Sequence, residues 1–203
     1  MSDVDRTWAG TTLADRRATR RTQLLDSGLE LLGAGGSAAV SVRAVCRHAR
    51  LTERYFYESF TDRDELIIAV HDLVVTEAHQ ALVDAVAAAP VDDRPARARA
   101  AVTAFVELII DDPRKGHVLL LAPLADPALS SRGVERIPMF AALVRDELSD
   151  KVDEQDRAMT ATALVGGLAN LFTAYLDGTL EVGRDRLVEH CVKLVLGIDA
   201  LHA

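Results

Sequence analysis

Cysteine, aromatic residues and long apolar runs are all scarce in this sequence, and each shortage excludes something. The two cysteines, Cys46 and Cys191, stand alone without CxxC spacing, so neither a disulfide framework nor a zinc site is expected. Aromatic residues make up only 4% of the chain, which favours helix over sheet. The longest uninterrupted apolar stretch, residues 118–125, is far shorter than the roughly 20 residues of a membrane span. We expect no metal, no cofactor and no membrane partner.

Motifs of catalysis and export are missing as well. The sequence has no HExxH metal motif, no phosphate-binding glycine loop and no nucleophile elbow, so an enzyme is not expected. His117 lies near Asp111, Asp112 and Lys115 in sequence, but nothing in the pattern fixes a catalytic geometry. Residues 1–11 contain two aspartates and no apolar segment of the secretory type, so we expect a cytoplasmic protein.

Charge is distributed unevenly along a chain whose formal net charge is -8. Residues 16–63 contain nine arginines and five acidic residues, a local charge of +4. The other residues contain 14 basic and 26 acidic side chains, a charge of -12. A basic segment in an acidic chain is consistent with one surface that meets phosphates, although a run of charge is often only a solvated face.

The hydrophobic pattern predicts an all-α protein. A helix is expected from about Asp15 to Gly33, where Gly35-Gly36 ends it, and a capping box at Thr61 and Asp64 begins a long helix that Pro90 stops. Asp112-Pro113 and Asp126-Pro127 each have the form of an N-cap followed by proline. Residues 127–137 are ambiguous between short helix and loop. The remaining helices are expected at 94–111, 113–122, 138–149, 154–177 and 184–201.

Residues 41–60 carry the most informative motif. Ser41 caps a short helix that runs to about His48, a turn follows at residues 49–51, and Thr52 caps a second helix to about Phe60. Phe56 and Phe60 lie four residues apart on one face, so they are expected to pack inward and to lock a helix-turn-helix. The opposite face of the second helix is then free to enter a DNA major groove.

This segment resembles the DNA-binding signature of TetR-family (tetracycline-repressor-like) regulators. The resemblance covers residues 16–66 and rests on the Ser41 cap, the aromatic pattern of residues 56–60 and the charged turn before Leu66. Arg50 departs from it, because glycine is usual at that turn, and a left-handed Arg50 costs about 1 kcal/mol. Tyr55 is larger than the usual residue, and Ser59 replaces a frequent histidine. The resemblance implies DNA contacts by Arg43, Thr52, Arg54, Tyr55, Tyr57, Ser59 and Arg63.

The resemblance also implies three regions: an N-terminal tail (1–15), a helix-turn-helix domain (16–65), and a helical domain for ligand sensing and dimerisation (66–203). Two apolar stripes at helical spacing in the last two helices suit a homodimer interface, although such stripes are equally common in an ordinary core. The stripes comprise Leu164, Leu168, Leu171 and Tyr175, and Leu187, Cys191, Leu194, Ile198 and Leu201. Candidate ligand-binding residues are His79, Phe105, His117, Phe140, Asn170, Phe172 and Tyr175.

The expected function is that of a transcription regulator with double-stranded operator DNA and a small-molecule effector as partners. A dimer is expected to read a palindromic operator, and a largely apolar ligand to shift it to a state with displaced reading heads. Release from DNA makes the protein a repressor, as is common in the family that it resembles, although the opposite sign of control is physically equally possible. The alternative is a DNA-binding regulator or recruitment module without small-molecule sensing. The helix-turn-helix explains both equally well.

Overall fold

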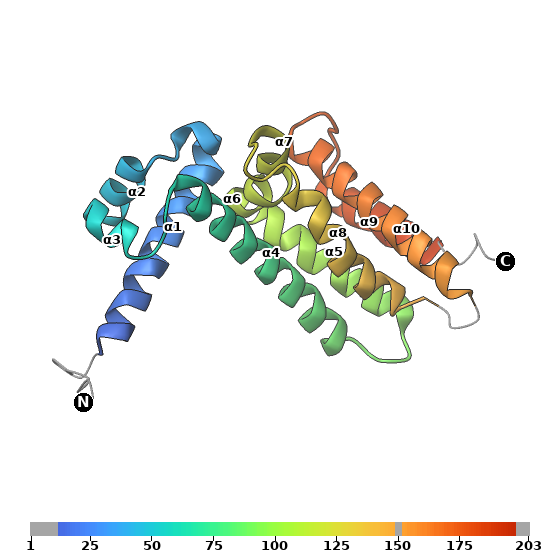
Figure 1. Ribbon diagram of the computed structural model, residues 1–203. Helices are drawn as coiled ribbons and strands as arrows, with labels where there is room; N and C mark the ends of the chain where they lie inside the picture. The colour runs from blue at the N-terminus through green and yellow to red at the C-terminus, as the bar shows by residue number, and fades with distance from the viewer. Residues whose placement is uncertain (1–11, 149–151, 198–203) are drawn as a thin grey trace.

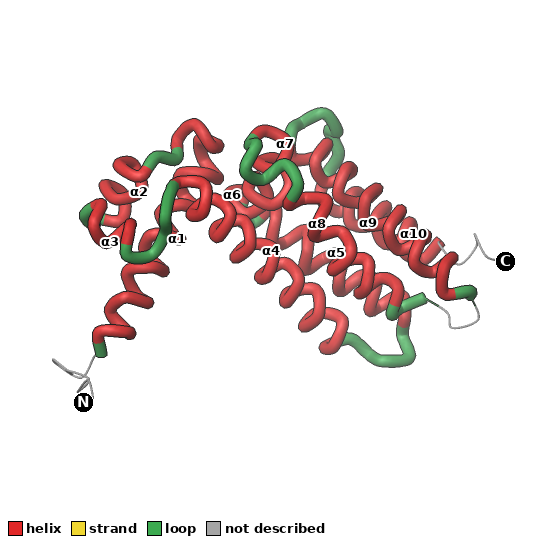
Figure 2. The backbone as a smooth tube through the Cα atoms, viewed as in Figure 1, coloured by secondary structure: helices red, strands yellow, loops and turns green. Residues whose placement is uncertain are grey.

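The computed structural model describes residues 12–148 and 152–197, and these ranges contain helices and no strand. Figure 1 shows a small helical head, from which α4 leads into a larger helical bundle, and Figure 2 shows how short the loops between helices are. The all-α prediction is confirmed. The head contains α1 (Leu13–Ala39), α2 (Val42–Ala49) and α3 (Glu53–Tyr57); the bundle contains α4 (Arg63–Ala88), α5 (Arg94–Ile110), α6 (Pro113–Gly116), the π-helical turn η1 (His117–Leu121), α7 (Ala122–Ala125), α8 (Arg132–Arg145), α9 (Glu154–Leu176) and α10 (Arg184–Gly197).

Helix α1 is longer than predicted at both ends. Thr12 caps it through a reciprocal pair of hydrogen bonds with Asp15, which the sequence analysis placed in a tail; residues 1–11 lie outside the described residues. At the other end the glycine pair interrupts the helix at Gly36, whose φ of 64° is open to glycine at little cost. A last short helical piece then runs to Ala39.

Helix α4 begins one residue later than predicted and with a different cap. The side chain of Asp62, not that of Thr61, accepts a hydrogen bond from the Glu65 amide at 2.8 Å. Glu65 accepts from the amide of Thr61 and not from that of the N-cap Asp62, so the reciprocal pairing of a capping box is not formed. The end at Ala88, just before Ala89-Pro90, is as expected.

Residues 113–125 form an almost continuous helical segment that packs against α1. Asp112 caps it as predicted, with Pro113 in the first turn. The contact with α1 is close at Gly33, where an added Cβ would lie 2.4 Å from the Cβ of Arg114. Arg114 also forms ion pairs with Glu30 on α1 and with Asp112. The bundle therefore touches the head directly through α1.

The predictions around α8 are wrong in two respects. No helix begins at Asp126-Pro127; Asp126 ends α7, and its carboxylate accepts a hydrogen bond from the Ala128 amide in a turn. Helix α8 begins at Arg132 and contains Pro138, where a helix start was expected. Proline is tolerated there because Val134 is 69% exposed, so the carbonyl left without a donor lies at the surface.

A continuous core joins the head to the bundle through α4. Leu24, Val45 and Phe56 have no exposed surface in the head, and Leu66 and Val70 of α4 are equally buried. Gly28 on α1 lets α4 approach closely, since an added Cβ would lie 2.8 Å from a methyl group of Val70. Because no flexible linker separates the two parts, a movement of α4 moves the head.

Helices α4 and α9 are both long and apolar enough to cross a membrane by length and composition alone, but they differ in burial. In α4, 39% of the apolar window is buried, as expected for a helix shared by two cores. In α9 only 11% is buried, so this apolar helix has an uncovered side. An uncovered apolar helix face of this size is typical of a surface that another molecule covers.

Two neighbouring aromatic residues test the packing of the head. Replacing the fully buried Phe56 with alanine should lower the free energy of unfolding by about 3–5 kcal/mol, because it opens a cavity between α1, α2 and α3. Replacing Tyr57, which is 57% exposed, should change it by only about 0.5 kcal/mol. Urea unfolding followed by circular dichroism measures both. Equal losses for the two variants would contradict the packing described above.

Candidate functional site

The head contains a helix-turn-helix whose turn depends on a left-handed arginine. Arg50 has φ 56° and ψ 37°, the conformation predicted for it, and its amide donates to the Arg47 carbonyl. The Leu51 amide donates to the Cys46 carbonyl at 2.9 Å. These bonds end α2 and turn the chain into α3. Ser41 caps α2 as predicted, with its hydroxyl accepting from the Ala44 amide.

The outer side of this motif carries exposed basic and aromatic side chains. The side chains of Arg43 and Arg54 are 90% and 85% exposed, and Tyr57 is 57% exposed. Each arginine is held only by a surface ion pair, Arg43 with Glu53 at 3.5 Å and Arg54 with Glu58 at 3.4 Å. Such pairs contribute about 0–1 kcal/mol, so a phosphate or a base edge can replace them at little cost.

Thr52 occupies the N-cap position of α3 but makes no side-chain cap hydrogen bond, in contrast to the prediction. Its side chain is exposed, so the hydroxyl is available to an acceptor outside the protein. Helix α3 ends at Tyr57, about one turn earlier than expected, although Phe60 is still anchored in the core, 2% exposed.

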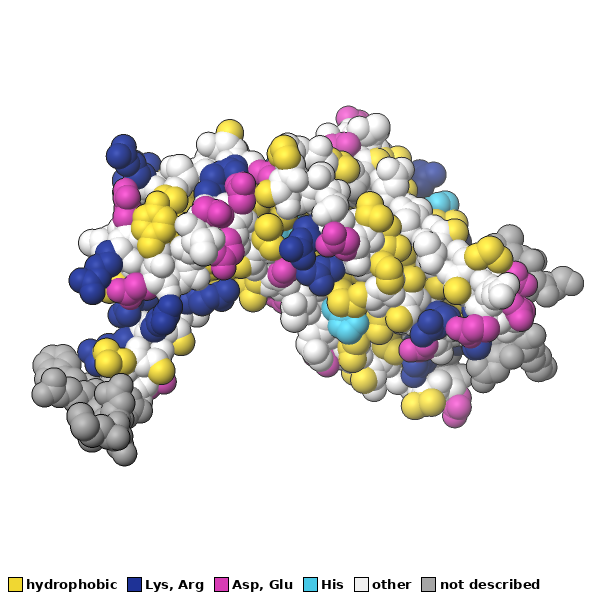
Figure 3. All heavy atoms as spheres, viewed as in Figure 1, with side chains coloured by type: hydrophobic (Ala, Val, Ile, Leu, Met, Phe, Trp, Pro, Cys, Tyr) yellow, Lys and Arg dark blue, Asp and Glu magenta, His cyan; other side chains and the backbone are white. Residues whose placement is uncertain are grey.

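Arginines of α1 extend the basic surface onto the side of α3. The guanidinium group of Arg20 lies 4.4 Å from the ring centre of Tyr55, and that of Arg21 lies 4.9 Å from the ring centre of Phe60. Arg17 donates to the main-chain carbonyl of Glu58. Tyr55 is thereby half-buried between α1 and α3, at the flank of the exposed side. Figure 3 shows dark blue side chains gathered over the α1–α3 end of the molecule.

Two residues predicted to contact DNA are turned inward. The hydroxyl of Ser59 is buried and has no hydrogen-bond partner, because the chain leaves the helix at Tyr57 and turns this side chain into the protein. Arg63 donates to the Val40 and Ser37 carbonyls, at 2.9 and 2.7 Å, and pairs with the buried Asp126 at 3.4 Å. It links the end of α1, the start of α4 and the turn after α7, while its Nη1 pairs with Asp64 at 2.6 Å and 34% of the side chain stays exposed.

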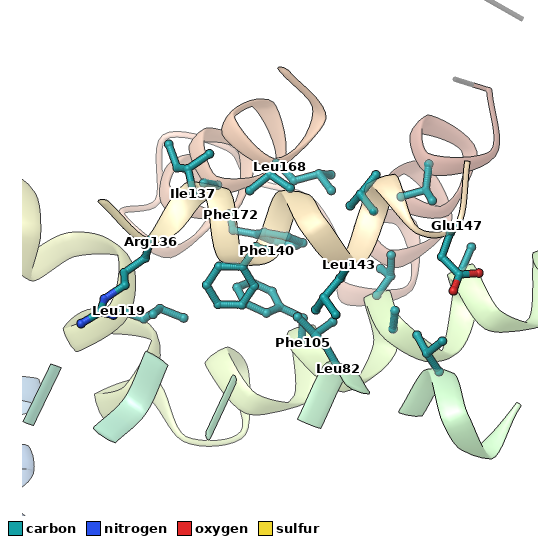
Figure 4. Close-up of a pocket in the computed structure, with 18 of the residues that line it drawn as sticks. Leu82, Phe105, Leu119, Arg136, Ile137, Phe140, Leu143, Glu147, Leu168 and Phe172 are labelled. Carbon is teal, nitrogen blue, oxygen red and sulfur yellow. The ribbon is translucent and has the colours of Figure 1, made fainter. Parts of the chain in front are cut away.

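The bundle contains an apolar cavity of about 200 Å³ between α4, α5, α8, α9 and η1, with Val195 of α10 also in its lining. Three phenylalanines predicted as ligand-binding residues line it: Phe105, Phe140 and Phe172. The rings of Phe105 and Phe172 lie 5.0 Å apart, and Figure 4 shows the three rings grouped in the middle of the cavity. Leu119 and Leu120 of η1 form part of the wall, so the segment that packs on α1 also borders the cavity.

The other predicted ligand residues lie outside this cavity. His79 lies beside Phe140, with ring centres 6.1 Å apart, but does not reach the cavity. His117 lies near Gly36, where the bundle meets α1. Asn170 is exposed on α9, and Tyr175 packs against the core near the end of that helix. The sequence pattern placed these four residues on apolar helices. It did not show which face of each helix lines the cavity.

Polar groups that the sequence analysis missed occupy the two ends of the cavity. His71 and Arg136 lie at one end, and Arg97 and Glu147 form an ion pair at the other; Figure 4 places Arg136 and Glu147 on opposite sides of the aromatic group. His71 is 1% exposed, and neither ring nitrogen has a hydrogen-bond partner. The sequence did offer a signal for His71, because it is a polar residue at a position of α4 where the repeating pattern calls for an apolar one.

Burial lowers the pKa of His71 because the charged imidazolium loses its hydration. Asp72 acts in the opposite direction, whereas the positive charges of Arg136 and Arg132 lower the pKa further. The net direction is downward, so His71 is neutral at neutral pH. Within the described residues, no group of three or more His, Cys, Asp or Glu side chains has the arrangement of a metal site.

The residues predicted for the dimer interface fall into three places. Leu187 and Cys191 are fully buried inside the bundle, where burial raises the pKa of the Cys191 thiol to about 11, so these two belong to the core of this chain. Leu168 lines the cavity and Leu171 packs against the core. Leu164 and Leu194 border a shallow groove between α9 and α10. Ile198 and Leu201 lie outside the described residues.

Comparison with known proteins agrees with this architecture. Residues 24–70 match the model of the family described as bacterial regulatory proteins, tetR family. Among curated proteins, no sequence is similar enough to count as a relative. A TetR-like transcriptional regulator from Rhodococcus sp. RHA1 has a similar structure, with a TM-score of 0.66 and 23% identity over 90% of this chain and 97% of that one. The fatty acid degradation regulator FadR from Bacillus halodurans has a TM-score of 0.73 and 14% identity, over 88% and 95%.

The fold and the exposed basic face of α3 define a helix-turn-helix DNA-binding protein. Residues 24–70 match the family model of the tetR DNA-binding domain, and the fold of the described residues is similar to that of solved TetR-like regulators.

The depressed pKa of His71 predicts how stability depends on pH. Below a pH of about 6.5 the unfolded histidine takes up a proton that the folded one resists, so the folded state loses stability as pH falls through this range. The free energy of unfolding should therefore fall less between pH 7 and pH 5 in a His71→Phe variant than in the wild type. Urea unfolding at both pH values measures the difference. A His79→Phe variant serves as control and should follow the wild type; identical slopes for all three proteins would contradict the burial argument.

Proposed function

We propose that this regulator is a homodimer that binds a palindromic operator and is released from it by a small, largely apolar effector. The observation that carries the proposal is the direct connection of an outward-facing α3, with Arg54 and Tyr57, to a bundle that encloses an apolar cavity. Release from DNA makes the protein a repressor, acting in the cytoplasm.

The DNA contacts divide into two kinds. Arg43, Thr52 and Tyr57 lie at the edges of α2 and α3, where they suit phosphates, and Tyr55 lies beside them. Arg54 projects from the exposed side of α3, where it suits a base edge in the major groove. Arg63 is not free to contact a phosphate with its inward-facing donors, so we assign it the role of fixing α4 against α1.

Two arginine variants distinguish these kinds of contact. Arg43→Ala should weaken binding to all duplexes and reduce the dependence of affinity on salt by about one unit of slope, because one phosphate contact is lost. Arg54→Ala should relax the preference at one base pair, which is worth about 1–3 kcal/mol. Selection of bound fragments from random DNA, followed by titration at several salt concentrations, measures both effects. An Arg54→Ala variant with unchanged base preference would contradict the assignment.

The uncovered side of α9 supports dimerisation. Met159, Ala163, Gly167 and Asn170 lie along one exposed side, and an added Cβ at Gly167 would meet nothing within 4 Å. Leu164 and the 42% exposed Leu194 border the groove beside it. Pairing of this face with a second copy would form a four-helix interface and hold two reading heads on one duplex, where half-sites are about 34–36 Å apart.

A charge placed in this face tests the dimer. Ala163→Glu should shift the protein from dimer to monomer and reduce operator affinity by at least tenfold, because a buried unpaired carboxylate opposes association. Sedimentation equilibrium measures the oligomeric state. Leu124→Glu is a matched control, since Leu124 is apolar and 74% exposed but lies on α7, away from this face. A dimer that survives Ala163→Glu would place the interface elsewhere.

Coupling between ligand and DNA is proposed to run through residues 113–125. Leu119 and Leu120 border the cavity, while Arg114 of the same segment packs against Gly33 and Glu30 of α1. A ligand that pushes on η1 therefore acts on α1, and through Asp126 and Arg63 on the start of α4. A ligand shifts this equilibrium only by its difference in affinity for the two states.

The apolar lining sets the effector class. Most lining residues are aliphatic or aromatic, so a ligand gains its affinity from apolar burial. One structure with the same fold is described as a fatty acid degradation regulator, which supports an apolar effector here without identifying it.

A further inference from the structure

At one end of the cavity, two side chains have buried nitrogen atoms without a hydrogen-bond partner. Both ring nitrogens of His71 are buried and without a partner, and so is Nε of Arg136. Both side chains line the cavity, and both approach the same carboxylate oxygen of Asp72: Arg136 through its terminal nitrogen, in a hydrogen bond, and His71 at 3.8 Å, too far for one. The two unmatched groups are therefore neighbours.

Buried polar groups without partners are rare in proteins, and each needs a reason. Here two such side chains, His71 and Arg136, line the same cavity. A bound ligand group that forms the missing hydrogen bonds would explain both. A neutral imidazole offers one N–H beside its acceptor nitrogen, and Nε of Arg136 offers a second N–H, so an acceptor group could complete both donors. Two neighbouring donors suit the two oxygens of a carboxylate.

The opposite end differs because its groups already satisfy one another. Arg97 donates to both carboxylate oxygens of Glu147 in a bidentate ion pair. Among the charged side chains that line the cavity, three are arginines (Arg94, Arg97 and Arg136) and one is a glutamate. Arg97 pairs with Glu147 and Arg136 pairs with Asp72, so the preference for an anionic ligand comes from the N–H donors without acceptors and not from net charge.

We propose that His71 and Arg136 form a headgroup subsite for the carboxylate of an aliphatic acid, whose chain lies among Phe105, Phe140 and Phe172. This inference rests on the proposed function, since it specifies the effector class of the same cavity. The carboxylate accepts from the imidazole N–H and from Nε of Arg136, and the terminal nitrogen of Arg136 keeps its bond to Asp72. Asp72, Arg136 and Arg132 are the charged groups that act on His71.

The test compares three ligands with the same chain and different headgroups. Sodium decanoate, 1-decanol and decylamine, each below its micelle concentration, are added to the full-length protein. Thermal unfolding and calorimetry measure binding, and gel shift with the selected operator measures release. Decanoate should bind at least tenfold more tightly than decanol, since it gains two charge-assisted hydrogen bonds, and decylamine should bind most weakly. Octanoate and tetradecanoate show the chain length that the cavity accepts.

Variants assign the preference to the two residues. His71→Phe removes unmatched nitrogens from the interior, so the free protein should be as stable as the wild type or more stable, while its preference for decanoate over decanol should disappear. Arg136→Lys keeps the charge but lacks Nε–H and should reduce the preference about tenfold. His79→Phe is the matched control on the same helix and should retain the full preference.

The outcomes separate this inference from the broader function. Equal binding of decanoate and decanol to the wild type, or full preference in both His71→Phe and Arg136→Lys, would overturn the carboxylate subsite. Release of the operator by apolar compounds without a carboxylate, with none by decanoate, would overturn the subsite and leave the ligand-responsive regulator standing. Operator binding that no compound affects would contradict the ligand response itself.

Discussion

Phe56 has no exposed surface, and its ring lies 5.6 Å from that of Phe60 and 5.4 Å from that of Tyr57. This packing determines which side of the short α3 faces outward, because a helix of five residues has too few internal hydrogen bonds to be stable by itself. With Phe56 inside, Arg54 and Tyr57 face solvent, and Arg20 and Arg21 stack on rings at the flank. The position of the basic surface therefore depends on the packing of Phe56 in the apolar core.

The head is also fixed in orientation relative to the bundle. Gly28 lets α4 approach α1, Gly33 lets α6 approach it, and Arg63 joins two carbonyls of the head to Asp126 after α7. These three contacts surround α1 from different sides. The head and the adjoining part of the bundle are therefore packed as one unit.

The sequence predicted the head well because its signals are local. Caps, turn residues and aromatic spacing are read within a few positions, and Ser41, Arg50 and Phe56 each behave as expected. The positions that local patterns do not place are those where contacts with distant residues decide. Ser59 lies beyond the last turn of α3, the inward donors of Arg63 meet carbonyls 23 and 26 residues away, and Pro138 is accepted because its turn of α8 lies at the surface.

The bundle was predicted only as helices, because its helices are apolar on more than one side. Leu187 and Cys191 have the spacing of an interface but lie in the core, whereas most of the apolar window of α9 is not buried. The cavity is formed by segments far apart in the sequence, so Phe105, Phe140 and Phe172 could be named only from their rarity. For His71 the signal was its place in the apolar pattern of α4, and Arg136 had no distinguishing local signal.

The π-helical turn at residues 117–121 has a mechanical consequence. The Ala122 amide bonds to the His117 carbonyl, five residues back, so this turn holds one residue more than an α-helical turn. Relaxation to α-helical pairing would pass the surplus residue along the chain and rotate the adjoining helix by about 100°, the angle per residue of an α-helix. Such a rotation would move the side chains of the adjoining helical pieces relative to α1, because residues 113–125 pack against that helix.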